Sequence, residues 1–432
     1  MTLRPFALKI LHPLTRNKSR ASPDFYFDVE LRGTIKHRSK ALLIGLAYLS
    51  FVSLGLPDGL LGVAWPSIRA SFDLPLDALG ALLVMFTIGY LISSFSSGRL
   101  LAAMSVGTLL ALSCLATAAS LIGYALTSAW EVMVALGVLA GLGAGAIDAG
   151  LNTFAATQFS ARMVNWLHAC YGIGAAAGPV LMTSVLAMRQ PWQRGYAIVG
   201  CGQLLLAFCF ALTRRRWSDA SAGRENRVSA PSASAFATLR LPVVWLSVAV
   251  FFVYTGIEAA AGAWAYTLFT EARGVPMMAA GPWVSVYWGA LTVGRLLSGF
   301  VVGFVTVNRL LRFCTAGIAV GAAIVWLNVT NLTGFLGLAL MGLASAAVFP
   351  SLIATTPERL GETHTANGVG FQIAAAVLGQ SLLPAIVGLL ASRFGLEIIG
   401  PSLLAAAALL LVLFETLIAA KSEHAPVRYR ER

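Results

Sequence analysis

Charged residues are scarce in this chain of 432 residues: they make up 11% of it, whereas a soluble protein carries roughly 25%. Hydrophobic residues make up 58%, and so few charges cannot shield that much apolar surface from water. Apolar runs of about 20 residues or more recur along the chain, long enough for helices that cross a hydrocarbon layer of about 30 Å. The runs are continuous rather than alternating, which excludes a barrel and leaves helices as the way to pair every backbone group. The sequence predicts an all-α membrane protein.

Paired cysteines and enzyme motifs are also lacking. The five cysteines show no paired spacing and lie in or beside apolar runs, which argues against a disulfide framework or a metal cluster. They are interpreted as inert buried thiols: Cys114, Cys170, Cys201, Cys209 and Cys314. There is no nucleophile elbow, no phosphate-binding loop before a helix and no set of metal ligands. We therefore expect neither an enzyme, nor a bound metal, nor a cofactor.

Twelve transmembrane helices are predicted from the apolar runs. They are expected at about 41–67, 78–101, 107–127, 131–157, 164–188, 194–213, 242–270, 281–305, 309–329, 332–356, 364–392 and 396–420. The polar segment 214–241, which begins with three arginines, is interpreted as a cytoplasmic linker. It divides the chain into two six-helix bundles, 41–213 and 242–420, between a basic tail at 1–40 and a short tail at 421–432.

The net charge of +12 is distributed unevenly between the two sides of the predicted bundle. The tails, the linker and the loops on their side hold 24 of the 30 Lys and Arg residues, and the loops of the opposite side hold five. Positively charged loops stay in the cytoplasm. We therefore expect both termini and the linker to be cytoplasmic, and a basic tail beside anionic lipid explains the charge without nucleic acid.

The two predicted bundles repeat each other. Residues 89–98 align with 294–303 at an offset of 205, sharing Gly, Leu, Ser, Phe and Gly. Asp58 and Glu258 occupy comparable places in the first and seventh helices, at an offset of 200. A Gly-Leu pair in the fourth and tenth helices matches at an offset of 201. Two similar six-helix halves are a known transporter plan, and chance similarity between apolar sequences is the alternative.

Five ionisable residues are placed deep in predicted helices, where each costs about 2.5–3.5 kcal/mol and is a functional candidate by default. They are Asp58, Asp148, His168, Glu258 and Arg295. Asp58 follows Pro57, so the helix is expected to kink there and expose backbone groups to a cavity. Satisfying the freed backbone donors is the alternative role for Asp58.

The remaining candidates are predicted from helical spacing. Asn152 lies four residues after Asp148 on the same face, where a carboxyl and a carboxamide can bind solute hydroxyls together. Glu258 and Arg295 can neutralise each other, as a gating or structural pair as much as a binding one.

Neighbouring positions add weaker candidates. His168 can join a proton path, although packing is the alternative that we favour. Tyr254 and Trp264 flank Glu258 and are candidates for solute binding.

Several segments together resemble the major facilitator superfamily. The most specific are residues 141–152, with Asp148 and Asn152, and residues 165–179; Phe349-Pro350 and residues 379–384 are also similar. Within the superfamily, the chain resembles the fucose-permease-like branch of sugar–proton symporters over about 40–420. That resemblance implies that Asp58 and Asp148 serve proton coupling and sugar binding, although Asp replaces the more usual Glu at 148. The loop at 98–107 keeps a glycine of the family pattern but lacks its acid.

We therefore predict a secondary active transporter of a small polar solute, sugar-like in the first instance, driven by a proton gradient. Alternating access is expected around a central cavity lined by helices one, four, seven and ten. The alternatives are a proton-coupled exporter of drugs or metabolites, and a sensor without transport built on the same fold. The resemblance implies a bacterial inner membrane, and a monomer with no nucleic-acid partner is expected.

Overall fold

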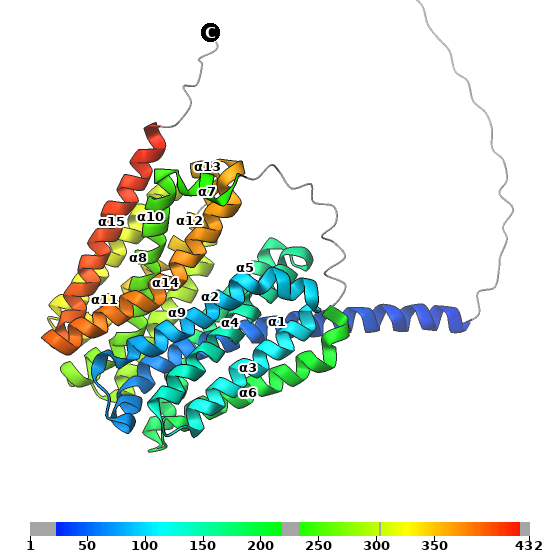
Figure 1. Cartoon of the computed structure of the whole chain (residues 1–432), viewed down its shortest axis with the longest axis horizontal. Helices are drawn as coiled ribbons and strands as arrows, with labels where there is room; N and C mark the ends of the chain where they lie inside the picture. The colour runs from blue at the N-terminus through cyan, green and yellow to red at the C-terminus, as the bar shows by residue number, and fades with distance from the viewer. Residues whose placement is uncertain (1–22, 218–232, 302–303, 424–432) are drawn as a thin grey trace, which may run out of the picture. The chain divides into compact units, whose positions relative to one another are not determined.

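The protein, seen here in a computed structural model, is helical throughout the part of the chain that the structure describes, residues 23–217, 233–301 and 304–423 (Figure 1). By their internal contacts, residues divide into two compact units, Met1–Gly45 and Leu46–Arg432. The helices of the first half are α1 (Pro23–Phe72), α2 (Leu79–Ala103), α3 (Val106–Leu126), α4 (Trp130–Gln158), α5 (Ala161–Ala187) and α6 (Gln193–Thr213). The longer helices of the second half are α8 (Pro242–Thr267), α9 (Met277–Val301), α10 (Val307–Leu327), α11 (Asn331–Ser345), α14 (Glu362–Phe394) and α15 (Ile399–Glu423).

Short helical segments connect these elements. They are η1 (Leu76–Ala78), α7 (Ala235–Leu239), the π-helical turn η3 (Leu268–Ala272), α12 (Val348–Ala354), α13 (Thr356–Leu360) and η4 (Leu396–Ile398). In the described residues, eleven helical segments are long and apolar enough to cross a membrane. The predicted helical membrane fold is thereby confirmed. The eleven do not include α9, which has 25 residues and is about 37 Å long at 1.5 Å per residue, more than a hydrocarbon layer needs.

Several predicted boundaries differ from the structure. α1 begins at Pro23, so part of the segment predicted as a basic tail is helical, and residues 1–22 lie outside the described part. The predicted helix 332–356 is interrupted at residues 346–347, between α11 and α12. Pro350 explains the interruption, because it has no N–H for the carbonyl of Ala346 and its ring clashes with that turn. The predicted linker 214–241 contains α7, and its residues 218–232 lie outside the described part.

Glycines let helices of the same half pack at backbone distance. A Cβ on Gly89 of α2 would stand 2.0 Å from the carbonyl oxygen of Val138, and one on Gly141 of α4 would stand 1.9 Å from that of Phe86. Small residues at such crossings are the usual means of helix association in a membrane, where the hydrophobic effect gives no help. This close packing fixes the rotation of α4 against α2, and thus the direction of the side chains on α4.

The two halves meet along a line of small residues, which we call the seam. Gly62 of α1 packs on the carbonyl of Gly262 in α8, Gly172 of α5 packs on Thr292 of α9, and Gly281 packs on Thr183. Gly62, Thr183 and Gly262 lie toward the C-terminal ends of α1, α5 and α8, whereas Gly172 lies near the middle of α5. Because α8 begins directly after the predicted linker 214–241 and Gly262 lies near its C-terminal end, the seam at Gly62 and Gly262 lies toward the side opposite to the linker.

An ion pair joins the halves at the same end. Arg69 Nη2 of α1 donates to both carboxylate oxygens of Glu271 in η3, at 2.9 and 2.7 Å. The two side chains are about 30% exposed, so water screens the pair and its stabilising effect is small, up to about 1 kcal/mol. The pair and the seam together close this end of the molecule.

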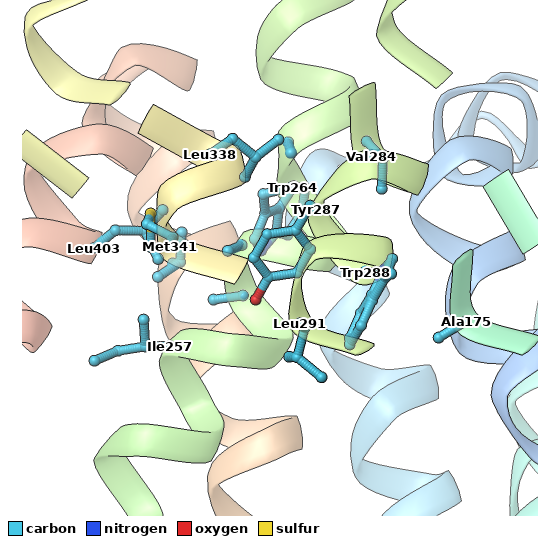
Figure 2. Packing of buried hydrophobic residues seen from close by; sticks show 14 of the residues in the cluster. Ala175, Ile257, Trp264, Val284, Tyr287, Trp288, Leu291, Leu338, Met341 and Leu403 are labelled. Carbon is cyan, nitrogen blue, oxygen red and sulfur yellow. The ribbon is translucent and has the colours of Figure 1, made fainter. Parts of the chain in front are cut away.

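The apolar core of the second half is built around large aromatic side chains. Figure 2 shows Tyr287 and Trp264 surrounded by Leu338 and Met341, and Trp288 extending toward Ala175 of the first half. The Tyr287 hydroxyl donates to the backbone carbonyl of Glu258, at 2.8 Å. A buried phenol needs such a partner, and this bond ties α9 to the turn of α8 that carries Glu258.

Candidate functional site

A cavity of about 240 Å³ lies between the two halves. All five of the deep ionisable residues predicted from the sequence line it: Asp58, Asp148, His168, Glu258 and Arg295. They come from five different helices, α1, α4, α5, α8 and α9. Residues scattered over most of the chain are thus brought to one site, and a bilayer helix bundle places functional side chains in just such an interior.

The helices around the cavity differ partly from the expectation. Helices one, four and seven line it as predicted, but helix ten (α11) contributes no lining residue in the described part of the chain, and α14 takes that position. Tyr254 and Tyr287 explain the difference. Tyr254 donates to the carbonyl of Ser345 at the end of α11, and Gly342 of α11 packs on the carbonyl of Tyr287, so both tyrosines stand between α11 and the cavity.

Asp58 is held by one tyrosine and keeps one oxygen free. The Tyr171 hydroxyl of α5 donates to Asp58 Oδ2 at 2.6 Å, and among the described residues Oδ1 has no hydrogen-bond partner. Pro57 cannot donate to the carbonyl of Ser53, and Gln203 Nε2 of α6 donates to that carbonyl instead, at 3.3 Å. Among the described residues no backbone N–H donates to the Asp58 carboxyl, whose one hydrogen-bond partner is Tyr171, so Asp58 does not satisfy freed backbone donors and one of its oxygens remains available.

Asp148 is held on both oxygens. The Tyr90 hydroxyl donates to Oδ2 at 2.7 Å and Asn152 Nδ2 donates to Oδ1 at 2.9 Å. Asn152 is not a lining residue of the cavity. The structure thus places the predicted solute ligand Asn152 as a partner of Asp148, and its binding of solute stays a prediction.

Glu258 and Arg295 form an ion pair across α8 and α9, with 3.6 Å between Arg295 Nη2 and Glu258 Oε1. The Tyr254 hydroxyl shares its one hydrogen between Glu258 Oε2, at 2.5 Å, and the Ser345 carbonyl, at 2.9 Å. The Glu258 side chain is 7% exposed and that of Arg295 is 22% exposed. A charge pair at this depth is expected to hold the two helices in register, and losing one member leaves the other uncompensated.

The other candidates lie at different depths. His168 lines the cavity, and its ring meets Phe51 edge to face with 5.3 Å between centroids. Tyr254 and Trp264 are fully buried behind the lining, and Trp264 Nε1 donates to the carbonyl of Pro384 at 2.9 Å. Their role in solute binding stays a prediction, and their observed contacts are those of packing and of helix positioning.

Three of the residues that line the cavity were not identified from the sequence. Tyr90 and Tyr171 stood among many aromatic residues, yet each bonds a carboxyl on another helix. The internal repeat could have indicated Tyr90, because the alignment of 89–98 with 294–303 pairs Tyr90 with Arg295, one of the deep ionisable residues. Gln380 of α14 also lines the cavity, and it lies in the motif 379–384.

Removal of Arg295 should destabilise the protein more than removal of the whole pair. In Arg295→Leu, Glu258 keeps its charge in a nearly buried position, and the expected loss is about 3 kcal/mol of unfolding free energy. The double variant Glu258→Gln with Arg295→Leu should recover most of that loss, as seen in the midpoint of thermal unfolding in detergent. Equal midpoints for Arg295→Leu and the unchanged protein would show that the pair does not stabilise the fold.

The chain was compared with known families and proteins. A family model described as "Major Facilitator Superfamily" matches residues 47–373. The chain is 22% identical to "Bypass of stop codon protein 6" of Saccharomyces cerevisiae over 63% of its length and 61% of that protein's. It is 23% identical to "Glucose/mannose transporter GlcP" of Bacillus subtilis over 61% of its length and 66% of that protein's. The chain thus spans less than two thirds of these two relatives.

Two further similarities extend over more of the chain. "Sodium-dependent glucose transporter 1A" of Mus musculus is 22% identical over 80% of this chain and 89% of that protein. Among solved structures, the crystal structure of the D323A mutant of nucleoside transporter NupG superposes with a TM-score of 0.74 over 87% of this chain and 99% of that one, at 15% identity. At that identity the structural similarity establishes the fold alone.

Proposed function

Because the chain belongs to the Major Facilitator Superfamily, a family of membrane transporters rather than of enzymes, we propose that it carries a small polar solute across the membrane together with protons. The solute proposed first is a monosaccharide. The two halves alternate in opening the cavity to either side, and the energy comes from the proton gradient.

The distribution of charge around the cavity carries this proposal. Its lining holds three carboxyl groups, of which Glu258 is paired with Arg295. Asp58 and Asp148 are held by neutral donors. Even with His168 positively charged, one carboxylate lacks a cation, and an uncompensated charge in a site of low dielectric is costly. A proton that binds and leaves relieves this cost, and this supports Asp58 and Asp148 as the coupling residues.

The size of the cavity supports a small solute. Its 240 Å³ lies below the roughly 300–1,000 Å³ of pockets for drug-sized ligands. That favours a sugar-like solute over the export of larger drugs. The names of two relatives refer to glucose, and that of the structural relative to nucleosides, which also contain a sugar.

The proposal includes a cellular setting. The excess of Lys and Arg on one side supports cytoplasmic termini and a cytoplasmic linker. Family resemblance supports the inner membrane of a bacterium, and a monomer is proposed with it.

A direct test uses purified protein in sealed liposomes, with a membrane-impermeant pH-sensitive dye in the outer medium. We expect that adding D-glucose or another monosaccharide from a panel alkalinises the outer medium, and that an imposed inward proton gradient raises sugar accumulation at least tenfold over a collapsed gradient. Replacing external K⁺ by Na⁺ at constant pH is the control, because one relative is named as sodium-dependent.

The same assay separates the alternatives. Proton movement opposite to the solute would instead indicate an exporter that exchanges solute for protons. Accumulation that follows Na⁺ and ignores pH would replace the proton by sodium. Absence of movement for every solute in the panel would favour a sensor without transport.

A further inference from the structure

Gln380 differs from the other polar residues discussed above, because its side chain is exposed in the cavity and has no partner in the described part of the chain. It lines the cavity from α14 and is exposed there. Within the described residues its carboxamide has no hydrogen-bond partner, so one acceptor and two donor hydrogens are free. The other glutamine of α14, Gln372, is buried: it donates to Ser247 Oγ at 2.6 Å and accepts from Thr356 Oγ1 at 3.0 Å. The carboxamide of Gln372 thus makes hydrogen bonds within the protein, whereas that of Gln380 makes none with the described residues.

The rotation of α14 is fixed by α8, which directs Gln380 to the cavity. Thr255 Oγ1 donates to the carbonyl of Ala376 at 2.8 Å, and Trp264 Nε1 donates to that of Pro384. A Cβ on Gly379 would stand 2.1 Å from the carbonyl of Phe252, so that face of α14 cannot turn. The lining residues Val377, Gln380, Ser381 and Pro384 follow the spacing of one helix face.

Pro384 adds a second free group at the same turn. A proline has no N–H, so the carbonyl four residues earlier, that of Gln380, loses its helical donor. No side chain of the described residues donates to it. By contrast, the carbonyl that Pro57 frees in α1 is taken by Gln203. Freed backbone groups at membrane depth are tolerated where they line a polar cavity, and here the freed carbonyl stands beside the free carboxamide.

We propose that Gln380 is a solute-recognition residue whose carboxamide binds two neighbouring hydroxyl groups of the solute, one donating to Oε1 and the other accepting from Nε2. This proposal rests on the proposed function and names the chemistry of its solute, a neutral molecule with adjacent hydroxyls such as a sugar. Because Asp58 and Asp148 lie on the first half and Gln380 on the second, a solute bound this way contacts both halves.

The test measures transport by the full-length protein in liposomes with D-glucose and its monodeoxy analogues as probes. Gln380→Met keeps the length of the side chain and removes its hydrogen bonds. We expect its KM for glucose to rise about tenfold, the value of one to two hydrogen bonds, with little change in kcat. In the unchanged protein, the deoxy analogue lacking a hydroxyl bound by Gln380 should show a similarly raised KM. In Gln380→Met, that analogue and glucose should become equivalent, while ratios for other analogues stay as they were.

A matched control is Gln372→Met in the same helix. It should lower the midpoint of thermal unfolding and leave every KM ratio unchanged, because Gln372 is remote from the cavity. Gln380→Glu is a second variant that keeps the acceptor and loses the donors, and it should restore part of the discrimination.

The outcomes are separable. If the unchanged protein transports the probes and Gln380→Met discriminates among them as the unchanged protein does, the role of Gln380 is refuted and the transport proposal stands. If the unchanged protein transports no probe, the sugar proposal is refuted, and the recognition of its hydroxyls with it.

Discussion

Proton-driven accumulation of solute should disappear when Asp58 is replaced by Asn, whereas exchange of solute for solute should continue. Asn has the shape of Asp and can still accept the hydroxyl of Tyr171, now 2.6 Å from Asp58 Oδ2. It cannot take up a proton. Because Asp58 lines the cavity and its other oxygen has no partner among the described residues, the loss of that proton is expected to abolish coupling without disturbing the helices around it.

This prediction is measured with the proteoliposomes described above, as accumulation under an imposed proton gradient and as exchange without one. We expect accumulation to fall by at least a hundredfold and exchange by less than threefold. Asp73→Asn is the control: Asp73 is exposed at the end of α1 with φ +52°, which Asn adopts readily. An Asp58→Asn protein that still accumulates solute would exclude Asp58 as the proton carrier.

A bulky residue in the seam should hold the closed end open and stop the cycle. Gly62 is the most sensitive position, because a Cβ there would meet the carbonyl oxygen of Gly262 at 2.6 Å and that of Ala263 at 3.1 Å. Backbone atoms cannot rotate away as a side chain can. In Gly62→Leu, α1 and α8 therefore have to separate, and the state with that end closed becomes inaccessible.

We expect Gly62→Leu to reduce transport at least tenfold while the protein remains folded. Access can be followed with a cysteine in place of Ala259, a lining residue of the cavity, after the five native cysteines are replaced by serine. A membrane-impermeant maleimide added on the side opposite to the linker should label it much faster in Gly62→Leu. Gly202→Leu is the control, since nothing lies within 4 Å of a Cβ at Gly202. Unchanged labelling and transport would show that the seam does not close the cavity.

The membrane fold could be predicted almost entirely from composition and apolar runs, and the deep ionisable residues from their cost in a bilayer. Asp58, Asp148, His168, Glu258 and Arg295 were selected by depth alone, and all five line one cavity. The reason is physical: a bundle in lipid leaves charged groups no favourable place except its interior.

The partners of these residues could be predicted only within a helix. Tyr254 and Glu258 are four residues apart, and their bond follows from helical geometry. Tyr90 and Tyr171 bond acids on other helices, and sequence gives no information on which helices become neighbours.

The sequence also did not predict which face of a helix points to the cavity. Apart from Glu258, α8 carries mostly apolar residues on every side, so its sequence gives little to distinguish the lining face from the packed one, and the buried positions of Trp264 and Tyr254 could not be foreseen. The interruption of the tenth helix could have been predicted, since Pro350 was visible in the sequence.

The bond from Gln203 to Ser53 has a mechanical consequence. A helical turn that has lost a backbone hydrogen bond to a proline can act as a hinge, but the Ser53 carbonyl that Pro57 leaves free in α1 accepts from Gln203 of α6, so this turn is braced and stiff. Any rocking of the first half must then carry Asp58 along as part of a solid body. The motion must then occur at the contacts between the two halves. The glycines there allow the two rigid halves to slide or separate without a change in the structure of either half.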